Sequence, residues 1–253
     1  MNILNEIIEN KKLRIEEARK RISVNELTGT DLFNREAVSL KQSILNGSGI
    51  IAEFKRRSPS FGDFPENSLE QTVRTYDHNG VSGISVLTDE NYFGGSCLDL
   101  AAARELTNLP ILRKDFIIDE YQLFEAKAFG ADAILLIAGV LDHYYAEQLA
   151  LMAKSIGLEV LMEFHSEEEL SKFNSNVDVA GVNNRNLDTL DTCIETSYRL
   201  FSSLPNEVVK ISESGIRSRR EMKKLRKVGY DGFLIGESFL KKQRSRKNLL
   251  TTK

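Results

Sequence analysis

The chain contains few cysteines, no long apolar run and almost no excess charge, and each shortage excludes a class of protein. Its two cysteines, Cys97 and Cys193, lie far apart and lack the spacing of metal ligands, which indicates reduced thiols and no metal site. No stretch reaches the apolar length of a membrane span, and no apolar segment stands at the N-terminus. We therefore expect a cytoplasmic protein without a membrane partner.

The charge balance gives no indication of a nucleic-acid partner. Lys and Arg total 34 and Asp and Glu total 37, which leaves a net charge of -3. Only residues 241–253 are markedly basic, and a solvated chain end explains them better than a functional patch. Neither a GxGxxG nor a P-loop pattern occurs. The histidines at 78, 143 and 165 lack clear partners, so we expect each to be structural.

What the chain does contain is a series of eight short apolar runs, several of which end in polar or charged residues. They span residues 50–55, 84–90, 110–116, 133–139, 158–164, 179–185, 208–215 and 233–238, with a mean spacing of about 26 residues. Helical patterns separate them, and several of these begin with Ser or Asp and end at Gly. Eight buried strands that alternate with helices predict a parallel α/β fold, the (β/α)8 TIM barrel.

The helices of this barrel are expected at residues 68–79, 96–107, 119–130, 142–157, 166–174, 191–203, 218–229 and after Gly236. Residues 1–49 precede the first strand and carry Ile and Ala on one helical face, which fits a coiled coil, a basic arm or a packed helical extension. We favour the packed extension. The chain 1–253 is then a single domain, with an N-terminal extension (1–49), a barrel (50–240) and a basic tail (241–253).

Charged side chains gather at the predicted C-terminal strand ends, where TIM barrels carry their chemistry. Glu53 and Lys55 stand two residues apart and share a face, Lys114 ends the third strand and Glu163 ends the fifth. Any one of them could simply meet solvent. Together, two carboxylates and two ammonium groups around one barrel mouth predict an acid/base site.

The last three strand ends suggest a polar and phosphate-binding region. Asn183 and Asn184 fit either a turn or contacts to substrate hydroxyls, and Arg185 matches the geometry of a carboxylate or a phosphate. Gly215 and Gly236 follow the seventh and eighth strands, where backbone N–H groups can bind an anion. The pair predicts a phosphorylated ligand.

Seven segments carry a family resemblance: IIAEFKRRSPSFG, YFGGS, PILRKDFIID, LEVLMEFH, GVNNRNL, ISESGI and LIGES. In order and register they resemble the motifs of the indole-3-glycerol phosphate synthase family, from about Ile50 to Leu240. The family is a carboxy-lyase of tryptophan biosynthesis that converts 1-(2-carboxyphenylamino)-1-deoxyribulose 5-phosphate to indole-3-glycerol phosphate, carbon dioxide and water. The resemblance implies a small phosphorylated substrate and neither cofactor nor metal.

The resemblance also implies catalytic roles. Lys114 would be the general acid that protonates the ribulose carbonyl, and Glu163 the partner acid/base of dehydration. Glu53 would support proton transfer. Lys55 would pair with the anthranilate carboxylate, and Asn183 would orient the ribulose hydroxyls.

The remaining residues that the resemblance assigns are substrate contacts. Polar contacts would come from Glu213 and Ser214, the phosphate end from Arg185, Ser58, Gly215, Gly236 and Glu237, and the anthranilate pocket from Phe93, Phe116 and Leu187. The chain departs from the family at Phe61, where the first loop often has Lys, and in its basic tail.

Two alternatives are weaker. A phosphoribosylanthranilate isomerase would need a Cys and an Asp at strand ends, whereas Cys97 and Cys193 are expected to start helices. A non-catalytic barrel that binds a phosphorylated ligand would be marked by loss of Lys114 or Glu163, and both are present. The sequence leaves open the oligomeric state, a monomer being one option, and whether Lys114 or Lys55 is the principal acid.

Overall fold

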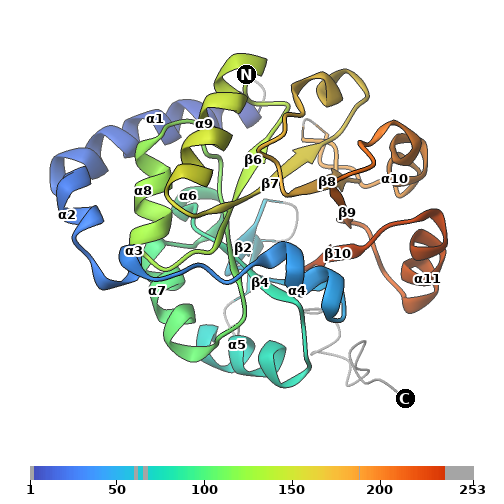
Figure 1. Cartoon of the computed structure of the whole chain (residues 1–253), viewed down its shortest axis with the longest axis horizontal. Helices are drawn as coiled ribbons and strands as arrows, with labels where there is room; N and C mark the ends of the chain where they lie inside the picture. The colour runs from blue at the N-terminus through green and yellow to red at the C-terminus, as the bar shows by residue number, and fades with distance from the viewer. Residues whose placement is uncertain (1–2, 60–61, 65–67, 188, 237–253) are drawn as a thin grey trace.

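Eight parallel strands close into a barrel in the computed structural model, which describes residues 3–59, 62–64, 68–187 and 189–236 (Figure 1). The strands are β1 (Ile50–Phe54), β4 (Gly83–Leu87), β5 (Ile111–Lys114), β6 (Ala133–Ile137), β7 (Glu159–Phe164), β8 (Val179–Asn183), β9 (Val209–Glu213) and β10 (Gly232–Ile235). Each strand pairs with its neighbours in chain order, and β1 pairs with both β4 and β10, which closes the barrel. The predicted TIM barrel is therefore confirmed.

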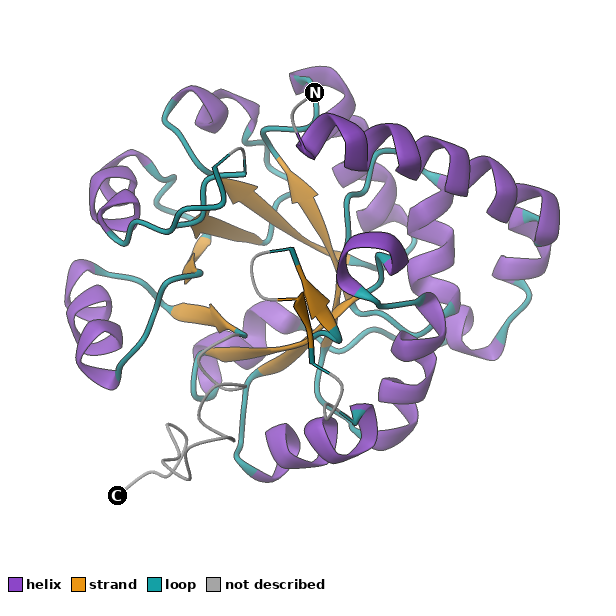
Figure 2. Cartoon of the chain, turned by 180° about the vertical axis from the view of Figure 1, so that it is seen from behind, coloured by secondary structure: helices purple, strands orange, loops and turns teal. Residues whose placement is uncertain are grey.

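Helices surround the strands, as both views show (Figures 1 and 2). They are α5 (Leu69–His78), α7 (Cys97–Leu106), α8 (Tyr121–Ala128), α9 (His143–Ser155), α10 (Glu195–Leu200) and α11 (Arg219–Val228), with 3-10 helices η1 (Glu168–Lys172) and η2 (Phe201–Ser203). The helix expected after Gly236 lies outside the described residues. Within the described part, no helix is long and apolar enough to span a membrane.

Two expected helices were wrong in detail. The segment 166–174 forms only the short η1, because Glu169 turns back to accept a hydrogen bond from the backbone N–H of His165 (2.7 Å). The segment 191–203 becomes helical only from Glu195, since Thr192 instead forms a β-bridge with Arg185. In both cases a contact within the loop replaces part of the expected helix.

The N-terminal residues form α1 (Ile3–Arg21), α2 (Val24–Thr28), α3 (Asp31–Asn34) and α4 (Leu40–Asn46), and they pack against the barrel. Ile7 joins the apolar cluster of the barrel interior, and Ile15 packs with Tyr121 of α8. The packed extension is thus the correct choice among the three. Ile22, on the predicted apolar face, is exposed because α1 ends at Arg21. The division at residues 240 and 241 stays a prediction, because 237–253 are not described.

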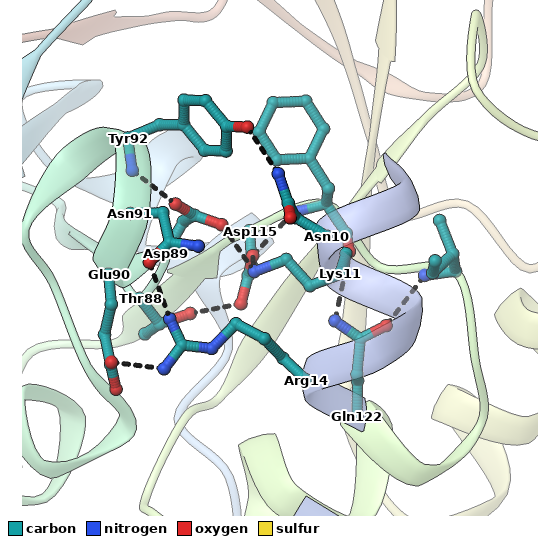
Figure 3. A network of polar contacts seen from close by, with 12 residues as sticks. Asn10, Lys11, Arg14, Thr88, Asp89, Glu90, Asn91, Tyr92, Asp115 and Gln122 are labelled. Atoms are coloured by element: carbon teal, nitrogen blue, oxygen red, sulfur yellow. Dashed lines mark hydrogen bonds and ion pairs between the residues drawn. The ribbon is translucent and has the colours of Figure 1, made fainter. Parts of the chain in front are cut away.

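A buried ion-pair network joins α1 to the strand ends (Figure 3). The Nζ of Lys11 lies 2.7 Å from Oδ2 of Asp89 and 2.6 Å from Oδ1 of Asp115, which follow β4 and β5. Thr88 donates a hydrogen bond to the other oxygen of Asp115 (2.6 Å). Burial alone would lower the pKa of Lys11, but the two carboxylates raise it, so this lysine remains charged inside the protein.

We expect Lys11→Met to lower the free energy of unfolding by about 3–5 kcal/mol, because it leaves two buried carboxylates without their shared cation. Urea unfolding followed by circular dichroism measures this loss. Arg14→Met is the matched control, since Arg14 pairs with Glu90 at the exposed side of the same helix and should cost less than about 1 kcal/mol. Equal and small losses in the two variants would show that Lys11 does not anchor α1.

Candidate active site

A cavity of about 660 Å³ opens at the C-terminal ends of the barrel strands. It is lined by most of the side chains that the sequence singled out: Glu53, Lys55, Ser58, Phe93, Lys114, Phe116, Glu163, Asn183, Arg185, Leu187, Ser214, Gly215 and Gly236. Glu213 is buried beside this group at the end of β9, and Glu163 lies close enough to raise the pKa of Glu213. Glu237 and Phe61 lie outside the described residues.

The two-residue period of the strands explains why these side chains meet. Ile51, Leu112, Leu161, Ile211 and Leu234 point into the barrel and form one apolar cluster. Two residues further along the same strands come, in the same order, Glu53, Lys114, Glu163, Glu213 and Gly236. The functional residues therefore stand one pleat above a packed layer, which fixes their backbone positions.

Lys114 and Glu163 form the central pair of the cavity. The Nζ of Lys114 lies 3.3 Å from Oε2 of Glu163, and Glu163 is buried. Burial alone would raise the pKa of Glu163, but the Lys114 ammonium and the His165 ring hold it well below the usual range. Burial alone would lower the pKa of Lys114, but the nearby carboxyl groups, Glu163 foremost and then Glu213 and Glu53, raise it. At neutral pH the pair is a charged acid beside a charged base.

Two further buried carboxyl groups at strand ends, Glu53 and Glu213, have pKa values shifted in opposite directions. Glu53 accepts a hydrogen bond from Lys55 (2.8 Å), and although burial opposes it, the neighbouring cations Lys55 and Lys114 lower the pKa of Glu53. Burial raises the pKa of Glu213 well above its usual value, and the nearby Glu163 carboxylate adds to this rise. Glu213 therefore holds its proton under conditions in which Glu53 and Glu163 are ionised.

One end of the cavity offers donors to an anion. Arg185 is fixed there by a hydrogen bond from its backbone N–H to Oδ1 of Asn183 (2.9 Å) and from its Nη1 to the Leu190 carbonyl (3.1 Å). Gly215 has a positive φ of 71°, and a Cβ at Gly236 would lie 2.5 Å from Oε1 of Glu53. Both glycines thus keep the backbone open at this end, as the phosphate prediction requires.

Asn183 and Asn184 each fit one of the two interpretations of their motif, a substrate contact and a structural turn. Asn183 lines the cavity and contacts the Glu163 carboxylate. Asn184 is buried, and its Nδ2 donates hydrogen bonds to Oγ of Ser212 and to the carbonyls of Glu213 and Ser214 (2.9–3.1 Å). Asn183 is placed to meet a ligand, whereas Asn184 holds the end of β9 in place.

The other end of the cavity is apolar and includes residues that the sequence reasoning missed. Phe93 and Phe116 stack at a tilt, with ring centroids 6.5 Å apart, and Leu187 joins them. Ile3, Leu4 and Ile7 of α1 also line this cavity. Their apolar face was assigned to packing alone. The short helix α6 (Glu90–Phe93), which carries Phe93, and the hairpin of β2 (Arg57–Ser58) and β3 (Gly62–Asp63), which carries Ser58, were also not predicted.

His165 is the second omission, and the expectation that it lacks partners was wrong. Its Nε2 lies 3.2 Å from Oε1 of Glu163, and its Nδ1 lies 3.3 Å from Oε2 of Glu169. The spacing Glu163-x-His165 at the end of a strand was the available signal, and it was overlooked. Cys97, by contrast, begins α7 as expected and is not among the residues of the cavity wall.

A closed parallel barrel with a Lys–Glu ion pair in a cavity at its C-terminal strand ends defines a TIM barrel whose candidate active site lies where enzymes of this fold carry their chemistry. Solved structures agree with the fold. An N-acetylmannosamine-6-phosphate 2-epimerase from Clostridium perfringens has a TM-score of 0.61 at 15% identity, covering 84% of this chain and 96% of its own. A tryptophan synthase complex from Pyrococcus furiosus has a TM-score of 0.58 at 15% identity, covering 79% and 91%.

Sequence comparison identifies the family. The family model of indole-3-glycerol phosphate synthase matches residues 4–251. An indole-3-glycerol phosphate synthase of Bacteroides thetaiotaomicron is 48% identical over 242 residues, which cover 95% of this chain and 93% of the relative. One of Campylobacter fetus subsp. fetus is 41% identical over 247 residues, with 95% of each chain covered. The chain belongs to the indole-3-glycerol phosphate synthase family, and neither the isomerase nor the non-catalytic barrel is favoured.

Proposed function

We propose that the cavity residues catalyse the indole-3-glycerol phosphate synthase reaction on 1-(2-carboxyphenylamino)-1-deoxyribulose 5-phosphate. The observation that carries the proposal is the Lys114–Glu163 ion pair, which lines a cavity with Arg185 and two glycines at one end and apolar side chains at the other. The substrate has a phosphate at one end and an aromatic ring at the other. Its reacting carbonyl would therefore lie between the two ends, near the pair.

Lys114 acts as the general acid of ring closure. As a ring carbon of the anthranilate attacks the ribulose carbonyl, the carbonyl oxygen gains negative charge and takes a proton from the ammonium group. Loss of carbon dioxide then restores the aromaticity that the attack removed. The three carboxyl groups that raise the pKa of Lys114 keep it protonated and ready to donate.

Glu163 acts in the dehydration step, in which the new hydroxyl group leaves as water. Its lowered pKa means that it begins as a carboxylate and accepts a proton before it can donate one. Glu53, which is also ionised and is bonded to Lys55, supports the proton transfer. Glu213 and Ser214 supply polar contacts to the substrate.

The two ends of the cavity bind the non-reacting groups of the substrate. Arg185, Ser58, Gly215 and Gly236 hold the phosphate, with Glu237 as a further contact that the sequence predicts. Lys55 pairs with the anthranilate carboxylate, Asn183 orients the ribulose hydroxyls, and Phe93, Phe116 and Leu187 surround the aromatic ring. One chain contributes all of these groups, which supports a monomer as the active unit. The thiols of Cys97 and Cys193 are free, as is usual for a protein in the reducing cytoplasm. Neither a nucleic acid nor a membrane takes part.

The experiment that tests this proposal is fluorescence detection of indole-3-glycerol phosphate formed from the synthetic substrate. Wild-type protein should turn over, and Lys55→Met should raise KM at least about tenfold with a smaller change in kcat, because Lys55 contributes to binding of the substrate carboxylate. An exposed-lysine control, Lys154→Met, should behave as wild type. A loss in kcat at unchanged KM for Lys55→Met would show that Lys55, and not Lys114, is the principal acid.

A further inference from the structure

His165 lies directly beyond Glu163, outside the cavity wall. The two oxygens of the Glu163 carboxylate face different cations: Oε2 lies 3.3 Å from the Lys114 ammonium, and Oε1 lies 3.2 Å from Nε2 of His165. The imidazole is 13% exposed, and the carboxylate it faces is 1% exposed, so water screens this pair little. The orientation of the carboxylate thus depends on both neighbours.

Glu169 of η1 holds His165 in place from the opposite side. Its Oε2 lies 3.3 Å from Nδ1 of His165 and accepts a hydrogen bond from the backbone N–H of the same residue (2.7 Å). Lys172 fastens η1 to the barrel by donating to the Ala138 carbonyl at the end of β6 (2.6 Å). The imidazole is therefore fixed between two carboxylates, one catalytic and one structural.

Charges of opposite sign alternate along this row, which runs from Lys114 through Glu163 and His165 to Glu169. We propose that His165, held by Glu169, is a positioning residue that orients the Glu163 carboxylate toward Lys114 and keeps it in the proton-accepting form. This inference rests on the catalytic role proposed for Glu163. His165 itself is not among the residues that line the cavity.

The electrostatics agree with the geometry. Burial alone would lower the pKa of His165, but Glu163 and Glu169 raise it to about 10, so the ring is charged at neutral pH. The groups that face Glu163 are Lys114 from β5, His165 after β7, Asn183 from β8 and Glu213 from β9; the first three lower the pKa of Glu163, and Glu163 in turn raises the pKa of Glu213. Without the imidazolium, the pKa of Glu163 should therefore rise.

The first test is the pH profile of kcat for His165→Gln. We expect kcat at pH 7 to fall roughly 10- to 100-fold with little change in KM, since a misplaced catalytic group can cost that much. The acid limb of the profile should move to higher pH, because Glu163 would gain its proton earlier. Glu169→Gln should move it less in the same direction, and His143→Gln, which alters an exposed histidine at the start of α9, should leave it unchanged. An unmoved acid limb with unchanged kcat in His165→Gln would overturn the proposal.

A second measurement needs no folded His165 variant. NMR titration of the imidazole in wild-type protein should show His165 still protonated at pH 8, whereas an ordinary histidine titrates near 6.5. Titration of His165 near 6.5 would also overturn the inference. In Glu163→Gln the titration should shift toward lower pH. If that variant keeps full activity while the shift occurs, then the contact is real and the proposed role of Glu163 is what fails.

Discussion

Replacing Lys114 by Met is expected to lower kcat by about 10²–10⁴-fold, the usual contribution of one well-placed general acid. Methionine keeps the length and apolar stem of the lysine side chain but has no proton to give. The carbonyl oxygen would then develop its charge during ring closure beside the carboxylates of Glu53 and Glu163, which repel it. KM should change much less, because the groups at the two ends of the cavity remain. Steady-state kinetics followed by indole fluorescence separate the two parameters.

Lys55→Met is the comparison that tests whether Lys114 is the principal acid. Both lysines line the cavity and lie beside carboxylates, but Lys114 forms an ion pair with Glu163, whereas Lys55 forms one with Glu53. If Lys114→Met kept more than about a tenth of wild-type kcat while Lys55→Met lost nearly all of it, the roles of the two lysines would have to be exchanged. Thermal unfolding of each variant checks that an active-site loss is not a folding loss.

The barrel and most of the cavity could be predicted because both follow from local rules. The interval between apolar runs accommodates one strand and one helix. Because side chains alternate along a strand, Glu53 and Glu163 lie on the same inward face as Ile51 and Leu161, two residues earlier. Each of these inferences needs only a few consecutive residues. Closure of the barrel then supplies the long-range contacts without further information from the sequence.

Lys11 could not be recognised in this way. In the sequence it belongs to an alternation of Lys, Arg and Glu that resembles a solvated helix face. It is buried because α1 crosses the strand ends at the place where Asp89 and Asp115 emerge, as Figure 3 shows. No local pattern states that two carboxylates from separate loops will surround one lysine.

His165 shows a different kind of failure. Its partner Glu163 was already a candidate two residues away, and alternation along a strand puts residues i and i+2 on the same face, so the contact was within reach of the sequence. The second partner was not, because β7 ends at Phe164 and Glu169 reaches the ring only through the fold of the loop that follows. The strand period therefore predicts the contact with Glu163, whereas the loop decides the contact with Glu169.

Glu163→Gln is expected to lower kcat by about 10²–10⁴-fold, like the loss of Lys114, but for the opposite reason. The amide fills the same space and can still bond to its neighbours, yet it cannot accept a proton in the dehydration step. The low pKa of Glu163 in the wild type means that this group is ionised throughout the neutral range and loses its function only when the pH falls below the usual range of a carboxyl group. In the variant, activity should therefore be low at every pH.

Glu213→Gln is the matched comparison, because burial and the neighbouring Glu163 raise the pKa of Glu213 well above its usual value, so Glu213 keeps its proton where Glu163 has lost its own. A glutamine reproduces a neutral carboxyl group closely, so this substitution should cost clearly less in kcat than Glu163→Gln does. Both residues are buried glutamates, at the ends of β7 and β9, and their pKa values are shifted in opposite directions. If Glu213→Gln were the more damaging change and Glu163→Gln were tolerated, the catalytic base would be Glu213, and Lys114 would be paired with Glu163 for structure alone. The pair of variants thus tests whether charge, and not position at a strand end, selects the carboxylate that does the chemistry.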